Sequence, residues 1–223
     1  MSQDVTIIIG THRNFALLRN CLRTLYAYTL AGYELIIVDN ATDIPSKKLI
    51  ALYQRLLEKD LKVIINPDNN KGFAEWNNQA VNQANRKYVL FLNDDTVLVP
   101  EWLTSMLELT KVENWGAISK KLLDRNGKET WHKGKKSGEV DESPATCLLV
   151  KREDAYFDEE FRGYYFEDLD LILRLKRRGL KIIAERTRPI YHIGAASTQK
   201  IDPVQFSKMV SRNQGLYELR RRE

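Results

Sequence analysis

The sequence predicts an α/β fold built on a mostly parallel central sheet, and three observations support this prediction. Four short apolar runs recur within the first 92 residues. Stretches with helical spacing of apolar residues separate these runs, and polar turn residues follow each run directly. Because alternating strands and helices with short connections are typical of parallel sheets, we expect helices to cover both faces of one sheet.

The first half of the chain is expected to form four strands with three helices between them. The strands are predicted where apolar, largely branched residues follow one another, at residues 5–9, 34–38, 61–65 and 88–92. The first helix should follow Asn14, which can cap it, with Leu18, Leu22 and Leu25 on its buried face. The other two helices are expected at residues 46–58 and 73–85, the second after the turn cluster 66–72.

The second half of the chain is less regular, and we expect a smaller mixed or antiparallel part there. A helix is predicted at residues 100–112, with Pro100 at or just before its start. The polar stretch 120–142 contains Asn126-Gly127, which favours a hairpin. Strands are expected at residues 115–118, 146–150, 181–184 and 188–191. A helix should begin near residue 167 and end at Gly179, and a basic helix should occupy residues 203–222.

Composition and charge exclude several classes of protein. The 223 residues are 43% hydrophobic and 29% charged, which is ordinary for a soluble globular protein. No apolar run approaches the roughly 20 residues that a membrane-spanning helix needs, and no secretory signal opens the sequence. Cys21 and Cys147 sit in apolar surroundings, as reduced cysteines of a cytoplasmic protein do. The net charge of +5 is spread along the chain, so we expect no nucleic-acid partner.

Adjacent carboxylates follow the strand at residues 88–92, in the segment Asn93-Asp94-Asp95. Ligands of open α/β sheets bind just outside the carboxyl ends of the strands. Two carboxylates there would repel each other unless a cation lay beside them, and a divalent metal with a phosphate-bearing substrate fits this need. Thr11 and Asp39 follow two other strands at the same expected edge. The alternative is that these acidic residues form ordinary hydrophilic turns or caps.

The order of these pieces resembles one enzyme family over nearly the whole chain. The resemblance is carried by residues 5–11, 17–25, 36–40, 66–74, 77–78, 92–96, 157–159 and 166–170, with Arg174, His192 and Ser197. In this order they are similar to family 2 glycosyltransferases of the GT-A fold. Within that family they most resemble the rhamnosyltransferase-like branch that acts on bacterial surface glycans. The resemblance implies a Rossmann-like sheet in a single domain of residues 1–223. Residues 1–98 would bind the nucleotide sugar, residues 99–200 would hold the acceptor and catalytic residues, and residues 201–223 would form the basic helix.

The resemblance also implies a reaction, a cofactor and metal-binding residues. The reaction is transfer of a sugar from a UDP-, dTDP- or GDP-sugar to an acceptor hydroxyl, with inversion at the anomeric carbon. Asn93, Asp94 and Asp95 correspond to the family's DXD motif. Asp95 would bind Mn²⁺ or Mg²⁺, Asp94 would lie near the ribose and reach the metal through water, and His192 would complete the metal site. A lone histidine is otherwise more often a structural residue.

The same resemblance assigns the catalytic and donor-binding residues. Asp168 is expected to be the general base, with Glu167 as its neighbour, whereas the residues alone would favour a helix cap. Binding of the nucleotide sugar is expected to involve Thr11, Asp39, Asn69, Lys71, Gly72, Asn93 and Asp94. The acceptor would be a glycan, a lipid-linked molecule or a protein-linked molecule. Contact of the basic helix with the inner face of the membrane is an open alternative to an entirely cytoplasmic location.

Two departures from the family pattern concern the donor side. Gly10-Thr11-His12 replaces the commoner Pro-Thr-Tyr, and Trp76 stands where a small residue is usual. Two other functions are weighed against sugar transfer. A sugar-nucleotide nucleotidyltransferase would need a glycine-rich, basic signature after the first strand, which residues 10–14 do not have. A non-catalytic module that only binds a nucleotide sugar would not need the metal, base and histidine positions.

Overall fold

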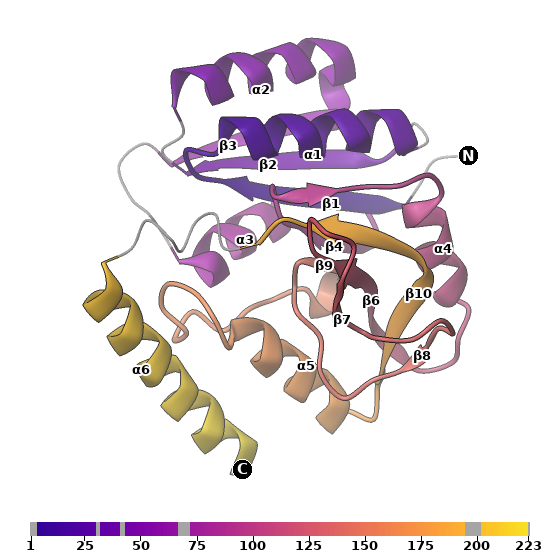
Figure 1. Ribbon diagram of the computed structural model, residues 1–223, viewed down its shortest axis with the longest axis vertical. Coiled ribbons are helices and arrows are strands. Elements are labelled where there is room, and N and C mark those ends of the chain that lie inside the picture. The colour runs from indigo at the N-terminus through magenta and orange to yellow at the C-terminus, as the bar shows by residue number, and fades with distance from the viewer. Residues whose placement is uncertain (1–3, 30–31, 41–42, 67–71, 195–201, 223) are drawn as a thin grey trace.

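The computed structural model describes residues 4–29, 32–40, 43–66, 72–194 and 202–222. Its strands are β1 (Val5–Thr11), β2 (Glu34–Asn40), β3 (Leu61–Asn66), β4 (Tyr88–Leu92), β5 (Thr96–Val97), β6 (Trp115–Leu123), β7 (Glu129–Trp131), β8 (Gly138–Glu139), β9 (Cys147–Lys151) and β10 (Lys181–His192). Its helices are α1 (Phe15–Tyr28), α2 (Ile44–Leu57), α3 (Phe73–Val81), α4 (Trp102–Leu109), α5 (Glu167–Arg177) and α6 (Pro203–Arg222), with short 3₁₀ turns at Glu58–Asp60 and Arg152–Asp154. Figure 1 shows their arrangement.

These strands form one mixed sheet in the order β3-β2-β1-β4-β9-β6-β10-β5. Strands β3, β2, β1 and β4 are parallel to one another. Strand β9 is antiparallel to both β4 and β6, and β6 is parallel to β10. It follows that β1, β2, β3, β4, β6 and β10 all end at the same edge of the sheet. The predicted α/β fold with a mostly parallel sheet and a smaller mixed part is therefore confirmed.

Two apolar cores lie on opposite faces of the sheet. On one face, Ile7 and Ile9 pack with Leu22 of α1 and with Trp102 of α4. On the other face, Ile8 packs with side chains of α3 and α5. Since successive residues of a strand point to opposite faces, a strand covered on both sides must be apolar at every position. This explains the uninterrupted apolar runs, and Figure 1 shows α1 and α2 on one side of the sheet with α3 and α5 on the other.

Strand β6 is longer than the sequence predicts, because it runs on to Leu123 through two lysines. The side chain of Lys120 is fully buried, and its ammonium group lies 2.5 Å from a carboxylate oxygen of Glu185 on the neighbouring strand. It also donates a hydrogen bond of 2.7 Å to the Ser105 hydroxyl. The predicted polar stretch therefore begins too early, since a paired lysine can continue a buried strand.

Three other predictions about elements need correction. Strand β10 is one strand with a register shift between Glu185 and Ile190, rather than two strands. Helix α3 ends at Val81 and not at residue 85, because the backbone N–H of Asn85 instead donates to Glu34. Asn14 occupies the N-cap position of α1, but its side chain makes no capping hydrogen bond. Gly179 does end α5 with a φ of +77°, as predicted.

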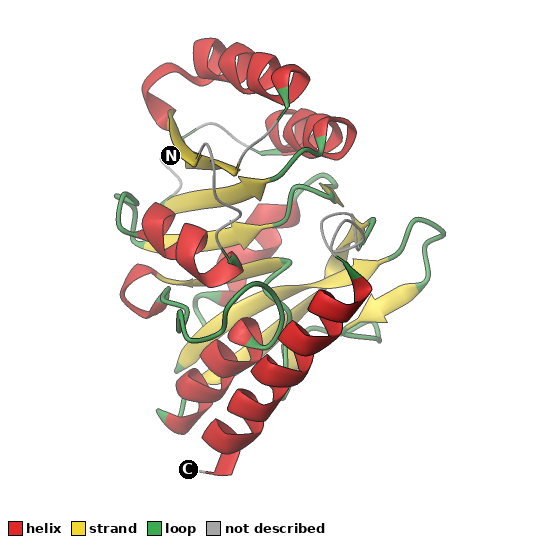
Figure 2. Cartoon of the chain, turned by 90° about the vertical axis from the view of Figure 1, so that its left-hand side faces the viewer, coloured by secondary structure: helices red, strands yellow, loops and turns green. Residues whose placement is uncertain are grey.

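Helix α6 runs alongside α5 at the end of the molecule remote from α1 and α2 (Figure 2). Among the residues that the structure describes, no helix has both the length and the apolar character needed to cross a lipid bilayer.

Candidate active site

The Asn93-Asp94-Asp95 segment leaves β4 at the common edge of the sheet and is held by the start of β9. The backbone N–H of Asn93 donates to the carbonyl oxygen of Thr146 at 3.0 Å. The side chains of Asp94 and Asp95 are both buried, with 6% of each residue exposed. The hydroxyl of Thr11, at the end of β1, donates to Asp94 Oδ2 at 2.8 Å. This edge therefore holds two buried carboxylates, one of which is oriented by a neighbouring strand end.

Asp95 faces His192, the last residue of β10. Their closest atoms, Asp95 Oδ1 and His192 Nε2, are 3.2 Å apart. The main chain beyond β10 fixes the other side of the residue, because Gly194 N–H donates to Asp95 Oδ2 at 3.2 Å and Ile193 N–H donates to the Asp95 carbonyl at 3.0 Å. Asp95 Oδ1 is buried and accepts no hydrogen bond from the described part of the chain. A buried carboxylate oxygen in this state has a lone pair available for a cation.

The residues present suit a hard divalent cation only as part of a larger set of ligands. Asp95 offers a carboxylate oxygen and His192 an imidazole nitrogen, and among the described residues no group of three His, Cys, Asp or Glu side chains could hold a metal ion. Mg²⁺ is commonly bound in this way, by one or two carboxylates together with substrate phosphates and water. The donor set therefore fits a cation that arrives with a diphosphate, and it does not fit a permanent structural metal.

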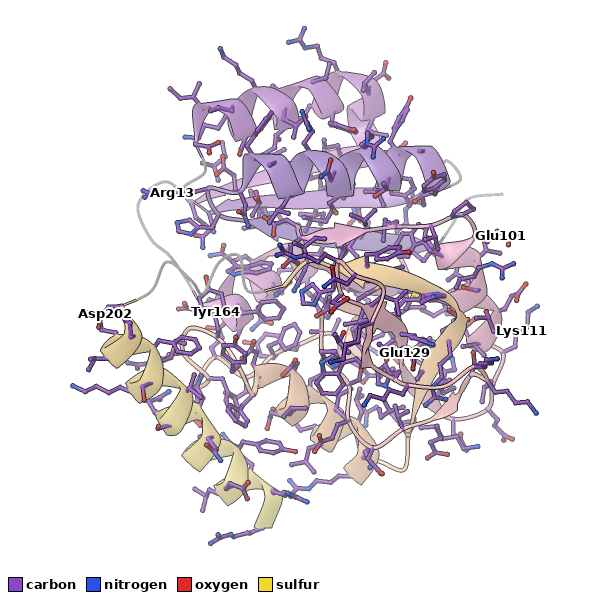
Figure 3. The ribbon with its side chains drawn as sticks, in the orientation of Figure 1. Arg13, Glu101, Lys111, Glu129, Tyr164 and Asp202 are labelled. Carbon is purple, nitrogen blue, oxygen red and sulfur yellow. The ribbon has the colours of Figure 1, made fainter. Side chains whose placement is uncertain are left out.

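A cleft of about 350 Å³ opens at this edge of the sheet. It is lined by Gly10, Thr11, His12, Asn40, Phe73, Trp76, Asn93, Asp94, Asp95, Trp131, Pro144, Ala145, Thr146, Tyr164, Tyr165, Phe166, Glu167, Asp168, Leu169 and His192. Tyr164 is labelled in Figure 3, on the loop that leads into α5. The cleft thus lies between polar groups at the strand ends and the consecutive side chains of Tyr164, Tyr165 and Phe166, which form an aromatic wall.

Glu167 and Asp168 open α5 and face the cleft from the second half of the chain. Asp168 Oδ2 accepts a hydrogen bond of 3.2 Å from the backbone N–H of Ala145. The next residue, Thr146, is the one that binds Asn93, so two consecutive residues connect the two acidic segments. Because they line one cleft and share this connection, Asp95 and Asp168 lie around the same space.

Burial changes the acidity of this acidic pair. Burial raises the pKa of Glu167 well above its usual range, and the negative charge of Asp168 raises it further. Burial also raises the pKa of Asp168, although the backbone N–H groups of Ala145 and Leu169 act against this by donating to its carboxylate. Glu167 Oε2 is buried and has no hydrogen-bond partner among the described residues. Carboxyl groups with raised pKa values in a cleft are candidates for proton transfer.

The other residues that were predicted to bind the donor have different outcomes in the structure. Asn69 and Lys71 lie outside the described residues. Asp39 is buried and pairs in register with Thr11, but Asn40 rather than Asp39 lines the cleft. Gly72 does not line the cleft either, and a Cβ atom there would lie 2.7 Å from the backbone nitrogen of Gly163. Gly72 therefore lets the start of α3 approach the loop that carries the aromatic wall.

Sequence reasoning missed the aromatic wall and the backbone of Ala145 and Thr146. The consecutive residues Tyr164, Tyr165 and Phe166 were a visible signal, since three aromatic residues in a row before an acidic pair are unusual for a simple turn. The roles of Ala145 and Thr146 depend on main-chain hydrogen bonds alone, and such bonds leave no trace in residue type.

The two departures on the donor side are in direct contact with each other. A Cβ atom at Gly10 would lie 2.2, 2.3 and 2.6 Å from three carbons of the Trp76 indole. Trp76 packs edge-on against Phe73, with ring centroids 4.9 Å apart, and both residues line the cleft. A glycine at position 10 is therefore what makes room for the large ring at position 76.

Comparisons with known proteins show which proteins this chain is similar to. The family model described as Glycosyl transferase family 2 matches residues 6–170. The chain is 27% identical over 227 residues to the O-antigen biosynthesis protein RfbC of Myxococcus xanthus, covering 86% of this chain and 17% of RfbC. It is 22% identical over 210 residues to the low-salt glycan biosynthesis hexosyltransferase Agl10 of Haloferax volcanii, covering 82% of this chain and 64% of Agl10. The chain therefore spans less than two thirds of the length of either relative.

Three solved glycosyltransferase structures share the fold at low sequence identity. GalNAc-T7 with UDP, GalNAc and Mn²⁺ superposes with a TM-score of 0.74 at 13% identity, covering 89% of this chain and 45% of that one. S. aureus TarS with UDP-GlcNAc gives 0.74 at 18% identity, covering 94% and 64%. The mannosyltransferase PcManGT of Pyrobaculum calidifontis with GDP-Man and Mn²⁺ gives 0.69 at 14% identity, covering 88% and 58%. With the family model matching most of its length and the GT-A fold in place, this chain belongs to glycosyl transferase family 2.

Proposed function

We propose that this chain transfers a sugar from a nucleotide diphosphate to a hydroxyl group of a glycan, lipid-linked or protein-linked acceptor, with inversion at the anomeric carbon. One observation carries the proposal. Asp95 Oδ1 is buried without a hydrogen bond beside His192, and the same cleft is lined by the acidic pair Glu167 and Asp168. A ligand for a cation and an acceptor for a proton thus border a single space, which is what displacement of a diphosphate by a hydroxyl requires.

Residues 1–98 are proposed to bind the nucleotide sugar. Thr11 and Asp94 are joined by a hydrogen bond at the end of β1, and Asp39 lies in register beside Thr11. The ribose and base would lie along this edge, and Asn69, Lys71 and Gly72 are proposed as further residues that bind the nucleotide sugar. UDP, dTDP and GDP all remain candidates. The solved structures that share this fold were obtained with UDP, with UDP-GlcNAc or with GDP-Man, which supports a nucleotide donor of this class.

Asp95 and His192 are proposed to hold Mn²⁺ or Mg²⁺, with Asp94 contributing through water. When bound, the divalent cation would neutralise the negative charge that develops on the departing diphosphate. The presence of Mn²⁺ in two of the similar structures supports this choice of metal. Asn93 in place of a first acidic residue removes one negative charge from the segment and leaves Asp95 as its strongest ligand.

Asp168 is proposed to act as the general base in the half formed by residues 99–200. Its carboxylate would take the proton of the acceptor hydroxyl while that oxygen forms a bond to the anomeric carbon. The bond from the same carbon to the diphosphate breaks, and the nucleoside diphosphate leaves with the bonding electrons. The N–H of Ala145 fixes one oxygen of Asp168 and orients the carboxylate. Glu167, whose pKa is raised by burial, would lie beside the base.

A panel of UDP-, dTDP- and GDP-sugars tests the proposal with wild-type protein, Asp95→Asn and Asp168→Asn. Release of nucleoside diphosphate is measured with Mn²⁺, with Mg²⁺ and with a chelator. Asp60→Asn is a matched control, because Asp60 is partly exposed and its ion pair with Arg86 is long, at 3.9 Å. We expect turnover in the wild type and the control that depends on the metal, and we expect it to fall by at least about 10²-fold in both site variants. Nucleotide binding without turnover on any donor would contradict the proposal and favour a non-catalytic binding module.

A further inference from the structure

One buried amide of α6 is hydrogen-bonded to the loop that forms the aromatic wall of the cleft. Asn213 is fully buried, although its helix is mostly polar. Its Nδ2 atom lies 3.0 Å from the carbonyl oxygen of Arg162 and 3.1 Å from those of Tyr164 and Tyr165. A carboxamide has only two N–H donors, so three carbonyl groups converge on one NH₂ group. Such convergence indicates that the loop is shaped around this side chain.

The same loop has an unusual backbone conformation. Gly163, Tyr165 and Phe166 have φ values of +81°, +74° and +74°. Residues with side chains rarely adopt this region, and they remain in it only where surrounding contacts compensate for the strain. The three hydrogen bonds from Asn213 supply such contacts, since the left-handed residues turn the carbonyl groups toward α6.

Further side chains of α6 hold the loop from the same side. Phe206 packs edge-on against Tyr165 with ring centroids 5.7 Å apart, and Tyr217 packs against Phe166 at 5.7 Å. Met209 lies so close to Gly163 that a Cβ atom there would be 2.2 Å from its sulfur. These contacts follow the length of the helix, which Figure 2 shows lying across this part of the molecule.

Arg220, near the end of α6, anchors the segment before the loop. Its guanidinium lies 2.9 Å from Asp158 and 2.6 Å from Glu160. At the other end, the loop leads directly into Glu167 and Asp168 at the start of α5. The acidic pair therefore follows a strained loop whose conformation is set from outside. The family model ends at residue 170, so the helix that sets it lies beyond the matched region.

We infer that Asn213 is a positioning residue, which holds the loop of residues 162–166 so that the aromatic wall and Asp168 face an acceptor sugar. This inference rests on the proposed function for the role of Asp168. It assigns the acceptor side of the cleft to contacts made by α6, while the donor side depends on β1, β2 and β4. The two sides should consequently respond differently to a change at Asn213.

Asn213→Asp is the test variant, because it keeps the size of the side chain but presents carboxylate oxygens to three carbonyl groups. Gln214→Glu is the matched control, since it makes the same chemical change at the next residue, which is exposed. Asn213→Ser is a milder second variant that retains one donor. Amide hydrogen exchange is measured for residues 158–170 and for β1 and β2, which report on whether the rest of the protein is folded. Rates of sugar transfer and the KM values for donor and acceptor are measured in parallel.

In Asn213→Asp we expect faster exchange in residues 158–170 and unchanged exchange in β1 and β2. The kcat for transfer should fall about 10- to 100-fold, as expected when a catalytic group is displaced by about 1 Å, while the donor KM stays within about twofold. Asn213→Ser should show a smaller effect of the same kind, and Gln214→Glu should behave as the wild type. Wild-type exchange and kcat in Asn213→Asp, or an equal loss in Gln214→Glu, would overturn the inference. A wild-type protein that transfers no sugar would instead refute the proposed function, and the exchange rates would still decide whether Asn213 holds the loop.

Discussion

Replacing Gly10 with alanine should force the Trp76 indole out of its position. The added Cβ atom would lie 2.2 Å from the nearest ring carbon. Carbon atoms that are not bonded to each other lie about 3.5–4.0 Å apart, so the ring or the strand must move by about 1.3 Å or more. Gly10 itself has no left-handed φ angle, so alanine suits its backbone and the clash with Trp76 is the whole difficulty.

The size of the effect follows from that clash. Adding a methyl group to a packed site costs about 1–3 kcal/mol of unfolding free energy. If the ring is first removed by Trp76→Ala, the same Gly10→Ala change should stabilise the protein by about 0.4–1 kcal/mol, because alanine has less freedom than glycine in the unfolded chain. The effect of Gly10→Ala should thus change sign between the two backgrounds, which corresponds to a coupling of about 2 kcal/mol.

A double-mutant cycle measures this coupling. Unfolding free energies of the wild type, both single variants and the double variant are obtained by urea denaturation followed by circular dichroism. For a chain of this length, 1 kcal/mol corresponds to about 2–4 °C in melting temperature, so thermal scans supply an independent check. If Gly10→Ala has the same effect in both backgrounds to within about 0.5 kcal/mol, the two positions are independent and the steric argument is refuted.

Four other predictions concern charged and titratable groups. Asp95→Asn should lower kcat/KM by about 10²-fold, since it removes the charged ligand of the proposed cation; rates across a Mn²⁺ titration measure this, and an unchanged rate would contradict it. Burial raises the pKa of Glu167 in the folded state above about 4.3, its value in unfolded chains, so its contribution to stability is complete below that pH and is lost as the pH rises through the folded-state pKa. In urea titrations, Glu167→Gln should therefore gain stability over the wild type as the pH rises toward 8. A constant difference in unfolding free energy between the two proteins over this pH range would contradict this prediction. Burial lowers the pKa of His132 from about 6.5 to about 4. Neutral His132 should therefore contribute about 3 kcal/mol to the free energy of unfolding above pH 6.5, and this contribution should be lost as the pH falls to 4. His132→Gln should weaken the fall in stability between these pH values, and an unchanged fall would show that other groups cause it. Lys120→Met should cost about 3–5 kcal/mol, because Glu185 is left buried without its partner, and a melting temperature within 3 °C of the wild type would be the contrary result.

Strands β1, β2 and β4 could be predicted because they are buried on both faces. Ile7, Ile8 and Ile9 are all fully or almost fully buried, with Ile8 in one core and its neighbours in the other. Such a strand contains a run of apolar residues that point to both faces, so the run identifies it without any knowledge of its partners. The same reasoning locates the ends of the strands, and with them the edge at which Asp94 and Asp95 lie.

Parts of the second half could not be predicted from the sequence, because they depend on partners that are distant in the sequence. Lys120 is a strand residue only because Glu185 neutralises it across β6 and β10. Asn213 is buried only because three carbonyl groups of a strained loop converge on its amide. No local pattern distinguishes these residues from solvated lysines and asparagines.

The candidate site was accessible from the sequence in part. The residue types at the ends of β1, β2 and β4 indicated an anionic edge, but only the family resemblance connected Asp95 with His192 and assigned Asp168 as the base. The structure brings these three residues to one cleft, and their roles stay predictions. The predicted contact of Asp39 with the nucleotide base also stays a prediction, since Asn40 lines the cleft and Asp39 does not.

The central claim is that one cation and one nucleotide diphosphate bind between Asp95, His192 and Asp168. It is tested most directly by a crystal structure of the protein with Mn²⁺ and a nucleoside diphosphate, in which the anomalous scattering of manganese locates the metal. We expect a single manganese peak within about 2–2.6 Å of Asp95 Oδ1 and near His192 Nε2, with the diphosphate bound to the metal on the side of Asp168. A nucleotide bound elsewhere, or a manganese peak away from Asp95, would show that these residues do not hold the cation.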